Sequence, residues 1–283
     1  MKNKRRLILL LMRTVLLLIM IVCLIELGQT YYLSVKHKKE QEDLKNILIA
    51  EESVAEQEEQ EESNGQEYEI EVIPEVLPSD DADDISEQEP EIMEKYKGLY
   101  EENNDLIGWL SIPGMVIDYP VMQNEDNEYY LHHSFYGEED KYGCLFVKDF
   151  VDVNAPSTNF IIYGHNMKDG SMFGDLDEYR EESFLQEHPL VYFNTLYEER
   201  TYEIMAVFLS QIYESDDDVF KYYEFYQADT EEEFLSFYEA ITGMSLYKTG
   251  VTAEFGDEFL MLSTCAYHVE DGRLVVIAKR VEI

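Results

Sequence analysis

Basic side chains are scarce in this chain of 283 residues. It has 21 Lys and Arg against 61 Asp and Glu, which gives a formal net charge of −40 at pH 7. Proteins that bind nucleic acid neutralise its phosphates with Lys and Arg. The charge balance therefore argues against a nucleic-acid-binding protein.

Cysteine is also rare, and its three occurrences are Cys23, Cys144 and Cys265. Small secreted domains that depend on disulfides carry many more cysteines along a short chain. The low content argues against a disulfide-stapled scaffold. A single disulfide between Cys144 and Cys265 stays open if the domain lies outside the membrane.

A long hydrophobic run lies near the N-terminus. Residues 7–25 read LILLLMRTVLLLIMIVCLI, which is 19 residues with one charge, Arg13. This is close to the minimum length for a helix that spans a bilayer. We predict an uncleaved signal anchor over residues 7–27, preceded by a basic tail, residues 1–6, that stays in the cytoplasm. A cleaved signal peptide is the alternative, but no small-residue cleavage site follows the run.

The region after the predicted anchor is strongly acidic. Residues 51–94 contain 19 Asp or Glu and no Lys or Arg. Such segments cannot bury enough apolar surface to fold alone. We predict that residues 28–94 form an extracytoplasmic tether that is largely disordered, with a helix over residues 31–45. A tail that binds a partner is the lesser alternative.

The remaining residues, 95–283, are predicted to form one folded domain of mainly β structure. A helix is expected from Ile92 to Leu106, where apolar residues recur at helical spacing. A second helix is expected after Thr230, which forms a capping-box pattern with Glu233. Short β-rich runs separated by turn residues predict about eight strands in a barrel or sandwich. These runs are residues 109–114, 115–122, 143–150, 159–165, 190–196, 200–213, 258–265 and 273–283.

Cys265 ends one of these runs, and Arg273 begins the next. If the two strands pair as antiparallel neighbours, both side chains lie at the same end of the sheet. A thiolate is a nucleophile, and a guanidinium offers fixed donors for an oxyanion. The pattern is therefore compatible with a cysteine-dependent acyl transfer. The alternative is that Cys265 is a small buried apolar residue.

A thiol nucleophile also needs a residue that carries protons, which is usually His. His165 directly follows an apolar strand and a glycine, and we expect it at the rim of the sheet. His268 shares the turn with Cys265 and is the main rival. The adjacent His132 and His133 could indicate a metal, but no second cluster has ligand spacing, so no metal is predicted. Asp216 to Asp218 fit a solvated loop better than a calcium site.

These residues give the chain a resemblance to a known family. The LSTC that ends at Cys265, the downstream Arg273 and the YGH that ends at His165 resemble the sortases, which are membrane-anchored cysteine transpeptidases. GWLSIPGMVIDYPVMQNEDNEYYLHHSF and NFIIYGHNMKDGSMFGDL are similar to class B sortases. The resemblance covers about residues 96–281.

The resemblance implies a role for each of the three residues. Cys265 would be the nucleophile, His165 the general acid or base, and Arg273 the group that stabilises substrate or oxyanion. The fold would be an eight-stranded sortase-type β-barrel with an N-terminal helix and a long helix between strands 6 and 7, preceded by a transmembrane helix. Asn166, Ser263 and Thr264 would contribute to substrate binding.

The implied reaction is an acyl transfer in two steps that needs no cofactor. The enzyme would cleave a C-terminal sorting signal after Thr, form a thioester on Cys265, and transfer the surface protein to an amine of the cell-wall precursor. The catalytic domain would face the cell wall of a Gram-positive bacterium. Cys265 is followed by Ala266 and Tyr267, where several class B members have an acidic residue, so no supporting carboxylate is expected there.

Three other functions are kept as alternatives. A pilin-polymerising sortase would use a pilin lysine as the acceptor, and the absence of an evident lid segment before the barrel argues against it. A hydrolytic cysteine peptidase would release its product to water. A surface binding module with an inert cysteine would have no enzymatic activity.

Overall fold

The computed structural model describes residues 2–65, 90–155 and 157–282, in two compact units, Met1–Asn46 and Ile47–Ile283. The first unit is helical and belongs to α1 (Lys2–Gly65). This helix contains a stretch that is long and apolar enough to cross a membrane, and its Leu, Ile and Val side chains are exposed. The finding fits the predicted membrane anchor.

The predicted tether differs from the structure in its first part. Residues 28–65 continue α1 as helix, including residues 51–65, for which the composition predicts disorder. Glu, Gln and Ala dominate residues 51–62, and all three have high helix propensity. The described part of α1 runs to Gly65. Residues 66–89 of the tether lie outside the described residues.

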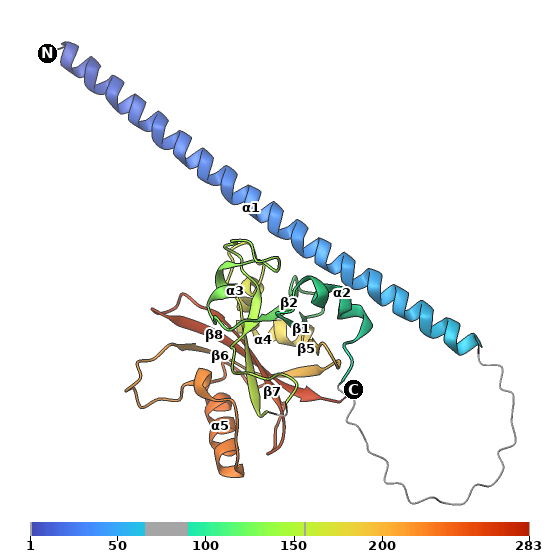
Figure 1. The fold of residues 1–283 in the computed structure, drawn as a ribbon. Coiled ribbons are helices and arrows are strands. Elements are labelled where there is room, and N and C mark those ends of the chain that lie inside the picture. Colours follow the sequence, from blue (N-terminus) through green and yellow to red (C-terminus); the bar gives the residue numbers. More distant parts are fainter. Residues whose placement is uncertain (1, 66–89, 156, 283) are drawn as a thin grey trace, which may run out of the picture. The chain divides into compact units, whose positions relative to one another are not determined.

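The second unit is built on a closed barrel of eight strands, which confirms the predicted fold (Figure 1). The order around the barrel is β1-β2-β3-β4-β7-β8-β6-β5. Neighbouring strands are antiparallel except for the β2–β3 and β4–β7 pairs, which are parallel. The strands are β1 (Leu106–Ser111), β2 (Asp118–Gln123), β3 (Leu145–Val147), β4 (Asn159–Tyr163), β5 (Leu190–Thr195), β6 (Thr201–Gln211), β7 (Phe259–Cys265) and β8 (Gly272–Val281).

The helices lie in the connections between strands. The predicted helix over residues 92–106 is shorter in the structure, because Asn103 ends it and Leu106 already belongs to β1. The Asn103 side chain accepts a bond from the Asp105 N–H, which turns the chain toward the barrel. The helices after α1 are α2 (Glu94–Glu102), α3 (Tyr129–His132), η1 (Gly174–Arg180), α4 (Glu182–Glu187), η2 (Tyr222–Glu224) and α5 (Glu231–Met244).

The helix α5 connects β6 to β7, as the resemblance implies, and packs on the outer face of the barrel (Figure 1). Its buried residues Phe234, Phe237 and Ile241 contact a row of apolar side chains from β4, β6, β7 and β8. Both faces of β7 are buried as a result, one inside the barrel and one under α5. The predicted capping box at its start is also confirmed, since Thr230 and Glu233 each bond the backbone N–H of the other.

Replacing Thr230 with Ala should destabilise the domain by about 1 kcal/mol, because the Glu233 N–H loses its acceptor at the start of α5. For a domain of this size we expect the melting temperature to fall by about 2–4 °C. Thr242→Ala is the matched control, since Thr242 lies near the end of the same helix and Ala has the higher helix propensity. Equal melting temperatures for the two variants would refute a stabilising capping box.

Candidate active site

Cys265 and Arg273 face each other across an antiparallel strand pair. Cys265 is the last residue of β7, Arg273 is the second residue of β8, and the register pairs the two directly. Residues 266–271 form the connecting turn, in which Asp271 has a φ of 51°. The two runs are therefore antiparallel neighbours, which is the condition on which the sequence argument depended, and the pairing brings a thiol and a guanidinium to the same end of the sheet.

His165 reaches this end of the sheet from the other side of β7. The strand β4 pairs with β7 in parallel, with Tyr163 opposite Ser263, and His165 follows two residues later. Two bonds hold the segment in place. Asn166 Nδ2 donates to the Cys265 carbonyl over 2.7 Å, and Thr264 Oγ1 donates to the Gly164 carbonyl over 2.8 Å. The backbones that carry His165 and Cys265 are thus linked to each other.

Cys265 and Arg273 continue one face of the sheet. Side chains alternate between the two faces of a strand. Met261 and Ser263 precede Cys265 at steps of two, and Val275 follows Arg273 in the same way. Met261 and Val275 lie in the apolar cluster under α5, on the outer face of the barrel. Cys265 and Arg273 therefore also lie on this outer face, beyond the edge of the apolar cluster, where both are half-buried.

Arg273 is oriented by the backbone of the turn beside it. Its Nη1 donates to the carbonyl oxygens of Asp271 and Gly272 over 3.1 and 2.9 Å. Among the residues that the structure describes, no acceptor lies at Nε or Nη2. These two nitrogens can therefore donate to an oxyanion or to a substrate carbonyl.

The imidazole of His165 is held by a backbone carbonyl. Its Nε2 lies 2.8 Å from the oxygen of Leu131, in the short helix α3. A carbonyl oxygen can only accept, so Nε2 carries the proton in this bond. The other ring nitrogen, Nδ1, is then the one that can exchange a proton with a reacting group.

Ser263 and Tyr222 form a buried pair on the same face as Cys265. The Ser263 hydroxyl is 2.8 Å from the Tyr222 hydroxyl, and both residues are at most 1% exposed. Burial raises the pKa of Tyr222 to about 12, although the bond to Ser263 and the charge of Arg273 both oppose the rise. The phenol is therefore neutral at physiological pH, and it presents a hydroxyl beside the candidate nucleophile.

The predicted substrate-binding residues have protein partners in the structure. Asn166 bonds the Cys265 carbonyl, Ser263 bonds Tyr222, and Thr264 is buried with its hydroxyl on Gly164. Thr264 belongs to the opposite face of β7 from Cys265, toward the interior of the barrel. Substrate contacts of all three stay predictions, and their observed bonds serve to join β4 to β7 and to pack the outer face.

His268, the alternative to His165 as the proton carrier, lies in the turn between β7 and β8. His268 is exposed, and its ring lies 2.9 Å from the position that a Cβ at Gly272 would occupy, so it packs on the backbone of the turn.

The cysteines all lie within the described ranges and all are free, so the alternative disulfide is wrong. Cys144 is a core residue, 3% exposed. Within the described residues, no group of three or more His, Cys, Asp or Glu could hold a metal ion.

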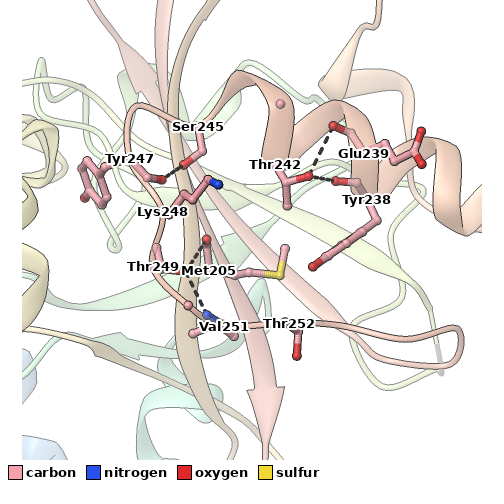
Figure 2. Close-up of a pocket in the computed structure, with 12 residues that line it drawn as sticks. Met205, Tyr238, Glu239, Thr242, Ser245, Tyr247, Lys248, Thr249, Val251 and Thr252 are labelled. Carbon is pink, nitrogen blue, oxygen red and sulfur yellow. Dashed lines mark hydrogen bonds between the residues drawn. The ribbon is translucent and has the colours of Figure 1, made fainter.

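Two hollows in the surface differ in their relation to this site. One of about 660 Å³ borders it directly, with walls from the segment after His165, from η1 and from Ala266 to His268. Another of about 400 Å³ lies at the C-terminal end of α5, between Tyr238, Met205 and the loop through Lys248 (Figure 2). Neither hollow is lined by His165, Cys265 or Arg273 themselves, but the walls of the first include their neighbours Asn166 and Ala266.

Two features of the site could not be read from the sequence. The Leu131 carbonyl is a backbone group with no residue signature, and α3 is only four residues long. Tyr222 lies in the short helix η2 between β6 and α5, where aromatic residues are frequent and no spacing singles it out. The adjacent His132 and His133 are the sequence feature that comes nearest to marking α3 as part of the site, since the ring centroid of His132 lies 6.5 Å from that of His165.

Comparisons with known proteins agree with this geometry. A family model for the sortase domain matches residues 110–281. Sortase B of Listeria monocytogenes is 37% identical over 198 residues, which are 68% of this chain and 76% of that protein. The crystal structure of sortase B from Bacillus anthracis in complex with AAEK1 is similar, with 36% identity and a TM-score of 0.60 over 69% of this chain and 88% of that chain. A Staphylococcus aureus sortase B–substrate complex has 25% identity and a TM-score of 0.61, over 68% and 87% of the two chains.

The exposure of the cysteines leads to a prediction about thiol reactivity. A methanethiosulfonate reagent should modify Cys265 in the native protein, because it is half-buried at the end of a strand, while the buried Cys144 should react only after unfolding. Peptide mass mapping separates these two sites from Cys23, and Cys265→Ala is the control for assignment. Native protein that stays unmodified at Cys265 would support the inert-cysteine alternative.

Proposed function

The chain belongs to the sortase family and, within it, to class B, and we propose that it is a cysteine transpeptidase that anchors surface proteins to the cell wall. It would cleave a C-terminal sorting signal after Thr and pass the protein to an amine of the cell-wall precursor. The observation that carries the proposal is the direct pairing of Cys265 with Arg273, beside a His165 segment that Asn166 ties to Cys265.

In the first step the thiolate of Cys265 attacks the carbonyl carbon of the scissile peptide bond. The carbonyl electron pair moves to oxygen, and Arg273 stabilises the resulting oxyanion through Nε and Nη2. When the tetrahedral intermediate collapses, the C–N bond breaks and His165 gives its proton to the leaving amine. The products are a thioester on Cys265, a neutral imidazole and the released C-terminal peptide.

In the second step an amine of the cell-wall precursor attacks the thioester. His165 takes a proton from the attacking nitrogen, and Arg273 again stabilises the oxyanion. The C–S bond then breaks, which forms the new amide and returns the thiolate of Cys265. No cofactor enters this sequence, because the bond energy of the thioester is carried over from the cleaved peptide.

The proposed location is the outer face of the cytoplasmic membrane. The apolar N-terminal helix fits membrane anchoring. The basic residues 1–6 favour a cytoplasmic N-terminus, which would put the catalytic domain on the side of the cell wall. The acidic residues between anchor and barrel would keep the domain away from anionic lipid headgroups, because like charges repel.

The triad can be tested by single substitutions in the full-length chain in detergent. Cys265→Ala should abolish cleavage of sorting-signal peptides. His165→Ala and Arg273→Ala should each lower kcat/KM by about 10²-fold or more, since one loses proton transfer and the other loses oxyanion stabilisation. Turnover is followed by mass spectrometry of the cleaved peptides.

Two variants serve as matched controls for this series. His268→Ala removes the imidazole in the same turn and should leave turnover nearly unchanged. Arg280→Ala removes a guanidinium from the far end of β8, where it pairs with Glu258 and Glu198. Loss of activity in His268→Ala, with normal turnover in His165→Ala, would show that the base is assigned to the wrong histidine.

The acceptor decides between anchoring and the two alternative reactions. We expect thioester turnover to accelerate when an amine that mimics the cell-wall precursor is added, with the ligated peptide as the main product. The measurement compares three conditions, which are a glycine-type amine, a lysine-containing pilin peptide and water alone. A rate that no amine changes, with only hydrolysed product, would identify a cysteine peptidase instead.

A further inference from the structure

We propose that the Leu131 carbonyl, held in place by a buried network around Tyr130, fixes the tautomer of His165 and so directs Nδ1 to the reaction. Leu131 and Tyr130 are then positioning residues, since they act through His165 and touch no reacting atom. The role of His165 in catalysis rests on the proposed function, whereas the tautomer itself does not.

The short helix α3 explains why a carbonyl is available to His165. A helix of one turn leaves its carbonyls without partners inside the helix. Each of these four groups bonds elsewhere. The Tyr129 carbonyl accepts from His133 Nδ1 over 2.8 Å, and the Tyr130 carbonyl accepts from the Cys144 N–H over 2.9 Å. The Leu131 carbonyl accepts from His165 Nε2 over 2.8 Å, and the His132 carbonyl accepts from the Asp140 N–H over 2.8 Å. His165 thus satisfies a backbone group that would otherwise lack a protein partner.

Tyr130 fixes the position of α3 from the core side. The residue is 2% exposed, and its hydroxyl donates to Asp105 Oδ2 over 2.8 Å and accepts from Asn103 Nδ2 over 3.0 Å. Asn124 Nδ2 donates to the same carboxylate oxygen over 2.7 Å. Burial raises the pKa of Tyr130, so its hydroxyl stays protonated and remains a donor to Asp105. The network ties α3 to the start of β1 and the end of β2.

Gly143 fixes α3 from the opposite side of its backbone. Its φ is 58°, and a Cβ at this position would lie 2.2 Å from the Tyr130 oxygen and 3.0 Å from the Leu131 oxygen. Only glycine permits this close approach. The backbone of residues 130 and 131 is therefore packed between Gly143 and the network, which leaves the Leu131 carbonyl little freedom to turn away from His165.

A neutral carbonyl suits this function because it can accept a bond without accepting a proton. In both protonation states of the ring, Nε2 keeps its hydrogen and Nδ1 gains or loses one. The imidazole can then cycle between the two states without rotating. A loss of the Leu131 contact would let the neutral ring place its proton on either nitrogen, and a fraction of the enzyme would present a hydrogen where a lone pair is needed.

The tautomer can be measured directly on the wild-type protein. Long-range ¹H–¹⁵N NMR of the full-length chain in detergent, labelled with ¹⁵N-histidine, distinguishes the two neutral tautomers at alkaline pH. His165→Gln identifies the signals of His165. We expect the Nε2–H tautomer, and a dominant Nδ1–H tautomer would overturn the proposal whatever the activity of the enzyme.

The network is tested by Tyr130→Phe, which removes one hydroxyl and keeps the ring. We expect a mixture of His165 tautomers and a fall in kcat of about tenfold with KM unchanged, because a displaced catalytic group loses orientation. Tyr202→Phe is the matched control, since Tyr202 is also fully buried but lies near the far end of β6. Its tautomer and kcat should match those of the wild type.

The outcomes separate this proposal from the proposed function. A lowered melting temperature of Tyr130→Phe with an unchanged tautomer and kcat would show that the network is only structural, and would overturn its positioning role. If Cys265→Ala still cleaved sorting signals, the proposed function would fail while the tautomer result stood. If Tyr130→Phe does not fold, the wild-type tautomer still decides whether Leu131 holds Nε2.

Discussion

The position of β7 between β4 and β8 is the constraint on which the rest of the site depends. Its antiparallel partner β8 brings Arg273 opposite Cys265, and its parallel partner β4 ends opposite Ser263 and leads into His165. Both pairings are continuous ladders within a closed barrel, so a shift of register would move every side chain of β7 to the wrong face. The same hydrogen bonds that stabilise the barrel thus bring the backbone segments that carry His165, Cys265 and Arg273 to one end of the sheet.

The outer face of these strands changes in character along its length. Under α5 it is apolar and fully covered, and toward Cys265 it becomes polar and half-open, with the Ser263–Tyr222 pair at the transition. The covered part supplies the rigidity that a catalytic constellation needs, because close-packed side chains do not shift independently. The open part leaves the thiol of Cys265 partly exposed to solvent. The same outer face of the sheet is therefore a packing surface under α5 at one end and carries the candidate thiol of Cys265 at the other.

The sequence predicted about eight strands and the α5 capping box, because both depend on local patterns, and it left the antiparallel pairing of the runs that carry Cys265 and Arg273 as a condition that the structure meets. The approach of His165 to Cys265 was inferable only through the family resemblance. It depends on a parallel pairing between strands that are about a hundred residues apart, which no local periodicity encodes. The helix over residues 51–65 differs from the predicted disorder, because the high helix propensity of Glu and Gln favours helix in a segment whose net charge alone indicates disorder.

The hydrogen-bond acceptors of His165 and Arg273 share a property that suits the proposed reaction, since all of them are uncharged. The chain carries a net charge of −40, yet the bonds of His165 and Arg273 to described residues go to the backbone carbonyls of Leu131, Asp271 and Gly272 and not to carboxylates. A carboxylate beside the guanidinium would neutralise the charge that an oxyanion needs, and a carboxylate on the imidazole would favour its protonated form at all times. Carbonyls orient both side chains and leave their charge available. The residue after Cys265 is the buried, uncharged Ala266, which is consistent with this arrangement.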